Sequence, residues 1–251
     1  MSSSDRRVLL QPAYVLHHRP YRDTSRILEL FTLEYGRISV FARGARGARK
    51  SASSLVSMLQ PFNRLLVSWS GRGEAGQLTG AEFDGAVAAL PRERLVSGFY
   101  LNELLLKLFA RHDAHPEVFT LYAETIEGLK DDADPLRRLR LFEKRLLESI
   151  GYGLALNTDA LSGQPLDRDS CYHYRLDQGA VRTHGVAEGS LIFSGATLVS
   201  LAREDLTDPA VCNDARRLLR AALERVLDGR ELKTRRVMLD LRSMRGNEVP
   251  K

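Results

Sequence analysis

The chain has 251 residues, enough for one large or two small domains, and its 43% hydrophobic and 27% charged residues are typical of a globular protein. Its formal net charge of +5 favours an anionic partner, either nucleic acid or an acidic protein surface. Two cysteines exclude a disulfide framework, and the absence of a signal peptide or a membrane-length apolar run predicts a cytoplasmic protein without a membrane partner.

The first eighty residues or so read as short β-strands separated by turn signals. Partly alternating, β-rich segments lie at 13–18, 26–34, 37–43, 64–70 and 77–83. Tight turns are expected at Tyr35–Gly36 and at 70–73, where glycines gather. Five strands in so short a stretch favour a small closed barrel, of which the oligonucleotide-binding (OB) fold is one type. The serine-rich segment 51–60 predicts one short helical turn at an end of that barrel.

A basic, glycine-spaced loop follows the third predicted strand. The stretch "RISVFARGARGARK" contains five cations and no acid: Arg37, Arg43, Arg46, Arg49 and Lys50. A solvated surface loop normally mixes both signs, whereas guanidinium groups on a flexible loop can follow a phosphate backbone. Beside exposed rings such a loop makes a single-strand platform, and the candidate stacking rings are Tyr35, Phe41 and Trp69. Core packing is the alternative role for each of these rings.

After Pro91 the pattern becomes helical. Apolar residues recur at helical spacing in 95–111, 116–130, 134–153 and about 213–228, with Asp134 as a cap and Gly151 as a stop for the third segment. Residues 157–190 are instead rich in Gly, Asp and Ser and contain two strand-like pieces, "YHYRL" and "AVRTHG". They predict a small β excursion from the helical region.

The third helical segment offers a second kind of site. It places Arg137, Arg140 and Lys144 on adjoining turns beside apolar residues that include Leu147. An apolar pocket rimmed by cations suits a short peptide that ends in acidic and aromatic residues. The simpler interpretation, favoured by the sequence alone, is an amphipathic core helix with a basic solvent face.

The sequence contains no pattern that predicts catalysis or a cofactor. It lacks Walker, Rossmann and Gly-x-Ser-x-Gly motifs, and "CYH" (171–173) with His184 offers at most three poorly spaced metal ligands. We therefore expect no catalytic residue, no metal site and no cofactor.

The order of motifs resembles the RecO family of bacterial recombination mediators. The similarity is carried by "AYVLHHRPYRDTSRILELFTLEYGRISVFARGAR", "LQPFNRLLVSWSGRGEAGQLTGAE", "GFYLNELLLKL", "LFEKRLLESIGYG" and "GRELKTR", which together span nearly the whole chain. The resemblance implies an α+β protein with a five-stranded OB-fold barrel, residues 1–83, followed by a helical domain, residues 84–251, with the β excursion at about 157–190.

The resemblance also implies a function. Such proteins bind single- and double-stranded DNA, anneal complementary strands, including strands coated by single-stranded DNA-binding protein (SSB), and with RecR and in some pathways RecF help to load RecA. A cytoplasmic, nucleoid-associated protein of the RecFOR pathway is the expectation. "FARGAR" matches the family's basic barrel segment, which implies a DNA role for Arg43, Arg46 and Arg37; Arg49 and Lys50 extend that loop by our own inference.

The family's pocket for the SSB C-terminal tail lies on the helical domain. Arg140 matches an arginine proposed to grip the tail, with Arg137 beside it and Leu147 and Ile150 as apolar wall. Many relatives carry a four-cysteine zinc module after "GYG"; this chain keeps one cysteine there, Cys171, so we expect an excursion without zinc. The rival hypothesis is a protein-interaction adaptor whose basic loop contacts an acidic partner, and a nuclease is a remote third.

Overall fold

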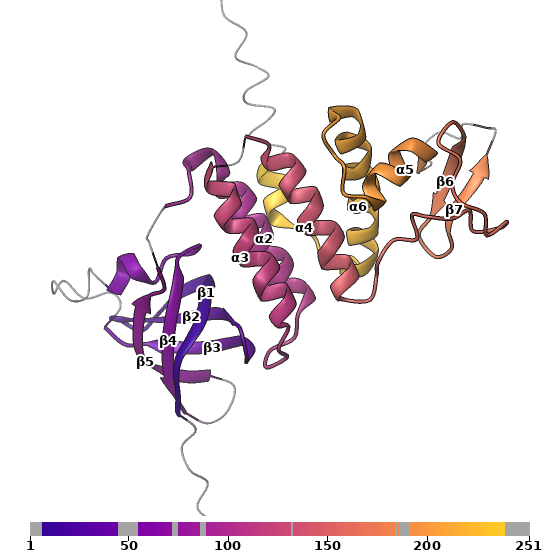
Figure 1. Cartoon of the computed structure of the whole chain (residues 1–251). Helices are drawn as coiled ribbons and strands as arrows, with labels where there is room; N and C mark the ends of the chain where they lie inside the picture. Colours follow the sequence, from indigo (N-terminus) through magenta and orange to yellow (C-terminus); the bar gives the residue numbers. More distant parts are fainter. Residues whose placement is uncertain are drawn as a thin grey trace, which may run out of the picture. The chain divides into compact units, whose positions relative to one another are not determined.

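The structure is a computed structural model that describes residues 7–44, 55–71, 75–85, 89–131, 133–183, 185 and 191–238 (Figure 1). The chain forms two compact units. Met1–Asp131 together with Leu232–Lys251 make the first, which we call the barrel unit, and Asp132–Glu231 make the second, the helix–sheet unit. The domain boundary that the sequence predicts after residue 83 stays a prediction.

The barrel unit begins with five strands that close on themselves, as predicted. They are β1 (Arg7–Tyr21), β2 (Ser25–Thr32), β3 (Gly36–Ala42), β4 (Arg64–Ser70) and β5 (Ala75–Phe83), in the spatial order β1-β2-β3-β5-β4. All neighbours are antiparallel except β3 and β5, and β1 pairs with both β2 and β4 to close the barrel. This architecture confirms the OB-type barrel.

Strand β1 starts at Arg7, earlier than the predicted strand at residue 13. Its first half pairs with β4 and its second half with β2, and the register shifts twice, between Val8 and Gln11 and between Val15 and His17. Such bulges bend a strand, which a fifteen-residue strand needs in order to serve two neighbours in a small barrel. Around Pro12 the alternation of apolar and polar residues is unclear, so alternation alone does not predict the first half of β1.

The barrel core follows the side-chain alternation of the strands. Residues two apart on β1, β2 and β3 point inward and are fully or almost fully buried: Ala13 and Val15, Leu28 and Leu30, Ile38 and Val40. The predicted helical turn occupies 55–58, and Leu59 after it is buried in the same core. The turn therefore packs against the barrel interior rather than lying on its surface.

Two helices pack against the outer side of β1 and β2 within the same unit. They are α2 (Leu95–Leu108) and α3 (Pro116–Asp131), which follow a short 3-10 turn η1 (Arg92–Arg94). The Tyr14 ring lies 5.0 Å from that of Tyr122 and 5.6 Å from that of Phe119. The barrel unit is therefore a barrel with one helical layer fixed to it.

The helix–sheet unit contains α4 (Pro135–Ser149), α5 (Gly195–Ala202), α6 (Pro209–Leu227) and a sheet of β6 (Cys171–Arg175), β7 (Gly179–Thr183) and β8 (Ile192–Ser194), in the order β7-β6-β8. Asp134 and Asp208 cap α4 and α6 by accepting backbone N–H bonds, and a proline follows each at the first helical position. The predicted β excursion is confirmed, whereas α5 and β8 were not predicted.

No helix among the described segments is long and apolar enough to span a membrane.

Candidate nucleic-acid interface

The basic loop leaves the barrel at the end of β3. Arg43 directly follows β3 and is exposed, as is Gly44 after it. Arg46, Arg49 and Lys50 lie outside the described residues, so the structure fixes only where the loop starts. Any ligand of the loop would therefore meet the surface that β1, β2 and β3 form around Arg43.

That surface carries an aromatic pair and several cations, which we call the barrel-end cluster: Arg19, Tyr21, Arg22, Phe41 and Arg43. The rings of Tyr21 and Phe41 have their centroids 5.1 Å apart, and the Arg22 guanidinium lies 5.3 Å from the centroid of Tyr21. Strand register brings the parts together, because Arg19 of β1 and Phe41 of β3 both pair with Ile27 of β2. Cations beside partly exposed rings are what a single-strand platform requires.

Sequence reasoning found Phe41 and Arg43 but missed Tyr21 and Arg22. The two halves of the cluster are about twenty residues apart in the chain and meet only through the β1–β2–β3 pairing. The usable signal was the run "RPYR" at the end of a predicted strand, which alternates cations with a ring.

The other two candidate stacking rings pack into the barrel. Tyr35 and Trp69 meet edge to face with centroids 5.2 Å apart, and Trp69 is only 9% exposed. Both contribute to the barrel core, Tyr35 as a partly buried residue at its margin. Of the three rings, only Phe41 belongs to the barrel-end cluster.

Arg37 lies apart from the barrel-end cluster and ties the barrel to α2. Its guanidinium donates to the backbone oxygens of Leu106 (2.5 Å) and Phe109 (2.7 Å) and lies 3.5 Å from the Glu29 carboxylate. Burial lowers the pKa of this guanidinium, although Glu29 opposes the shift. With a side chain only 12% exposed, Arg37 has a structural role in this geometry, and its DNA role stays a prediction.

Charge is divided unevenly between the two units. The barrel unit has 23 Lys and Arg against 16 Asp and Glu, whereas the helix–sheet unit has 14 against 16. The whole positive excess of the chain therefore belongs to the barrel unit. An attraction for polyanions is expected there and not in the helix–sheet unit.

The four residues predicted to bind the SSB tail all belong to α4 or its C-cap. Arg140 is 8% exposed and its guanidinium lies 2.8 Å from the Glu143 carboxylate, while Leu147 is fully buried in the core. Arg137 and Ile150 are both half-buried, and Ile150 ends the helix. The structure puts these residues on one helix but does not expose Leu147 as a wall.

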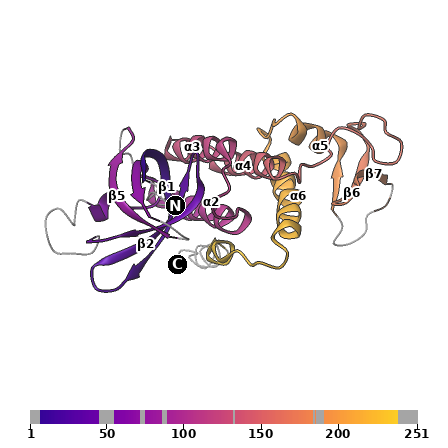
Figure 2. The ribbon, with the colours of Figure 1, turned by 90° about the horizontal axis from the view of Figure 1, so that it is seen from below.

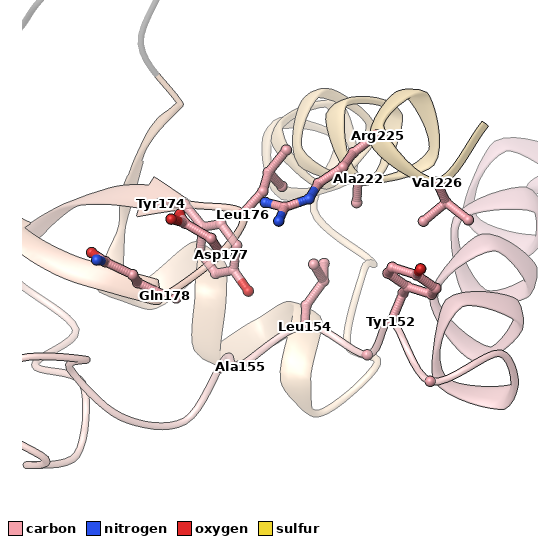
Figure 3. A pocket seen from close by; sticks show the side chains of 13 residues that line it. Tyr152, Leu154, Ala155, Tyr174, Leu176, Asp177, Gln178, Ala222, Arg225 and Val226 are labelled. Carbon is pink, nitrogen blue, oxygen red and sulfur yellow. The ribbon is translucent and has the colours of Figure 1, made fainter. Parts of the chain in front are cut away.

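A pocket opens directly after Ile150 (Figure 3). It encloses about 620 Å³ of empty space, open solvent at its mouth included, between the 151–155 segment, the β6–β7 turn and α6. Leu154, Leu176 and Val226 supply apolar lining, and the phenol of Tyr174 and the carboxylate of Asp177 supply polar lining. The Arg225 side chain extends over the pocket (Figure 3) and has no hydrogen-bond or ion-pair partner among the described residues. A cation above an apolar hollow suits an apolar group that carries a carboxylate.

Within the described segments, no group of three or more His, Cys, Asp or Glu is arranged to hold a metal ion. Cys171 is exposed on β6, and burial raises the pKa of the Cys212 thiol at the start of α6. A raised pKa makes that thiol a poor nucleophile at neutral pH. The environment of Cys212 is therefore not that of an activated thiolate.

Known proteins match this chain along its length. The family model "Recombination protein O N terminal" matches residues 7–85, and "Recombination protein O C terminal" matches residues 91–236. The chain is 47% identical over 232 residues to the DNA repair protein RecO of Alkalilimnicola ehrlichii, which covers 91% of this chain and 90% of that protein. It is 44% identical to the DNA repair protein RecO of Nitrosococcus oceani, covering 95% and 96%, and 45% identical to that of Methylococcus capsulatus, covering 91% and 92%.

The two family models together cover most of the chain, and these relatives match it over nine-tenths of its length. The chain belongs to the RecO family of DNA repair proteins.

Proposed function

We propose that this protein is a non-enzymatic DNA mediator that binds single- and double-stranded DNA on its barrel unit and anneals complementary strands. The observation that carries the proposal is the barrel-end cluster, where cations and two adjacent rings surround the start of the basic loop. The confinement of the positive excess to the barrel unit supports it.

Annealing needs no covalent chemistry. Two strands repel each other through their phosphates, so a protein that neutralises phosphates lets them approach. The bases must stay free to pair, and a protein that held every base would block the duplex. Arginines on a glycine-spaced loop suit this task, because they neutralise charge through contacts that exchange rapidly.

The same proposal includes strands coated by SSB. We infer that the SSB tail lies along α4, with its acidic residues near Arg137 and Arg140 and its apolar end beside Ile150, in the pocket beneath Arg225. Ten residues of helix from Arg140 to Ile150 span about 15 Å, the length of about five extended residues. Holding the tail would raise the local concentration of the protein at coated strands. RecR, and in some pathways RecF, would then act with it to load RecA.

Substitutions in the loop test the DNA proposal. Arg43→Ala, Arg46→Ala and Arg49→Ala together should reduce affinity for an oligonucleotide at least tenfold at 0.15 M salt and lower the salt slope by about 2–3, because each phosphate contact contributes roughly 0.7–0.9 to that slope. The control replaces Arg168, Arg175 and Arg203 of the helix–sheet unit by Ala, which removes the same charge. Equal losses in both variants would contradict a DNA site at the barrel.

The adaptor hypothesis makes the opposite prediction. If the loop meets an acidic protein, the loop variant loses that partner while its DNA affinity stays near that of the wild type.

A further inference from the structure

Two segments that the sequence singled out separately meet in the barrel unit. Glu103 belongs to "LNELLLKL" on α2, and "LKTR" begins at Leu232, where the chain returns from the helix–sheet unit. The Glu103 carboxylate accepts hydrogen bonds from the backbone N–H of Lys233 (2.9 Å), the backbone N–H of Thr234 (2.9 Å) and the Thr234 hydroxyl (2.7 Å). Leu232 is 3% exposed, so the returning chain is also fixed by apolar burial.

These contacts have the chemistry of a helix cap supplied by another helix. Residues 233–238 are helical, and the first N–H groups of a helix lack partners within it. A carboxylate satisfies two of them and lies at the positive end of the helix dipole. Burial alone would raise the pKa of Glu103, but the bonds from Thr234 and Lys233 hold it below its usual value. Glu103 is therefore charged at neutral pH and holds this segment against α2 (Figure 2, yellow).

The held segment is strongly basic. Its described residues, 232–238, contain Lys233, Arg235 and Arg236 and no acid. In sequence, the stretch 232–251 has six Lys and Arg against two Asp and Glu, more than half of the barrel unit's positive excess. Within the described part, Lys233 and Arg236 are exposed. Their charges point to solvent on the unit that carries the barrel-end cluster.

We propose that Lys233 and Arg236, held in place through Glu103, form a second phosphate-contact region for DNA on the barrel unit. The inference rests on the proposed DNA function and adds a surface outside the barrel. The proposal requires that these two cations be fixed to α2, because only then can they contact the same DNA as the barrel. Their positive charge alone is not enough.

The first test removes the charges. Lys233→Gln with Arg236→Gln should weaken DNA binding roughly 5–30-fold at 0.15 M salt and lower the salt slope by about 1–2, the expected effect of one to two lost phosphate contacts. The cap is unaffected, because it uses the backbone of residue 233. The matched control is Arg168→Gln with Arg203→Gln, two exposed arginines of the helix–sheet unit. If the variant and the control bind DNA equally well, the proposal is wrong.

The second test removes the clamp and leaves the cations. Glu103→Gln raises the net charge by one, so an effect of charge alone would tighten DNA binding. Loss of the clamp should instead weaken it at least threefold. Glu124→Gln, at an exposed acid on α3, makes the same charge change without touching the segment. Tighter binding by both variants would overturn the positional claim. The fluorescence of Trp69, the single tryptophan, verifies that the barrel is folded in each variant.

These outcomes separate the inference from the proposed function. If Lys233→Gln/Arg236→Gln binds like wild type while the Arg43, Arg46 and Arg49 variant loses binding, the second region is wrong and the barrel site stands. If neither variant changes DNA binding, the DNA proposal fails together with the inference.

Discussion

A buried chain of hydrogen bonds joins α3, α2 and β1. The Tyr122 hydroxyl donates to Asn102 Oδ1 (2.6 Å), and Asn102 Nδ2 donates to the backbone oxygen of Leu16 (2.9 Å). Asn102 is 2% exposed and Tyr122 is fully buried, which raises the pKa of Tyr122 well above its ordinary value. Each group in the chain satisfies its neighbour, so the helical layer is fixed to one register on the barrel.

Whether Tyr122→Phe destabilises the protein should depend on the presence of Asn102. Tyr122→Phe should lower the free energy of unfolding by about 1–2 kcal/mol in the wild type, because it leaves Asn102 Oδ1 unsatisfied. In an Asn102→Ala background the same change should be neutral or stabilising, because it removes a buried hydroxyl that has lost its partner. Urea unfolding of the four proteins gives the comparison. Equal costs in both backgrounds would show that the two side chains do not interact.

We expect Tyr21 to favour the binding of single-stranded over double-stranded DNA. Tyr21→Leu keeps apolar volume but removes a stacking surface, which is worth about 1–3 kcal/mol per base. We expect roughly tenfold weaker binding of single-stranded oligonucleotides and a smaller change for duplex DNA, measured by fluorescence anisotropy. Tyr152→Leu, an exposed tyrosine of the helix–sheet unit, is the control. A loss that is equal for both DNA forms would contradict stacking.

Sequence patterns predicted the site residues that are close together in the chain. Arg43 and Phe41 could be chosen because the loop follows the strand directly, whereas Tyr21 enters the cluster through strand pairing. Trp69 was a candidate because of its residue type, and Arg37 because of its place in the basic stretch and the family resemblance. Their burial depends on the closed barrel and on α2. Burial of this kind is a tertiary property that local alternation does not encode.

At the level of elements, two aspartates organise the loop before β6 by accepting hydrogen bonds. Asp159 Oδ1 accepts from the backbone N–H groups of Leu161 (2.9 Å) and Ser162 (2.8 Å), and its Oδ2 accepts from that of Arg182 on β7 (2.9 Å). Asp167 accepts from the Ser170 hydroxyl (2.7 Å) and from Arg182 Nη2 (2.9 Å). The loop before β6 is thus held to β7 by the carboxylates of Asp159 and Asp167.

These contacts predict acid sensitivity of the excursion. Hydrogen bonds from Ser162 and Arg182 lower the pKa of Asp159, and bonds from Ser170 and Asp169 lower that of Asp167. A lowered pKa means that the stabilisation is complete above the unfolded value of about 3.9 and is lost as pH falls through the folded value. The amide resonances of Leu161 and Arg182 should therefore shift together below about pH 4. In the Asp159→Asn variant, the amide resonance of Leu161 should no longer shift with pH in this range. If it still shifts, another group causes the titration.

The helices show which elements a single sequence reveals. Segments α3, α4 and α6 are long and amphipathic, so periodicity found them. The cap Asp134 also marked the start of α4, whereas α6 begins at Pro209, before the predicted start at about 213. Helix α5 has eight residues beginning Gly195–Ala196, and β8 has three, which is too short for a periodic signal. Their positions depend on pairing with β6 and on Ser194, whose side chain accepts from the Thr197 backbone N–H.

At the scale of the whole molecule, the two units differ in net charge as well as in structure. The barrel unit carries the positive excess and the partly exposed rings of Tyr21 and Phe41, and the helix–sheet unit is slightly acidic with a pocket beneath Arg225. The proposal therefore assigns the polyanion to the barrel unit and the short peptide to the helix–sheet unit. The account of strand annealing on coated DNA depends on both being occupied at once.

The most direct test measures annealing of complementary oligonucleotides that have been coated with SSB. Intact SSB and SSB without its acidic tail are compared at two salt concentrations. The account predicts annealing that requires the tail and weakens as salt rises. Annealing of bare strands alone would contradict the tail site, and no annealing under either condition would contradict the central claim that this RecO-family protein is a DNA mediator.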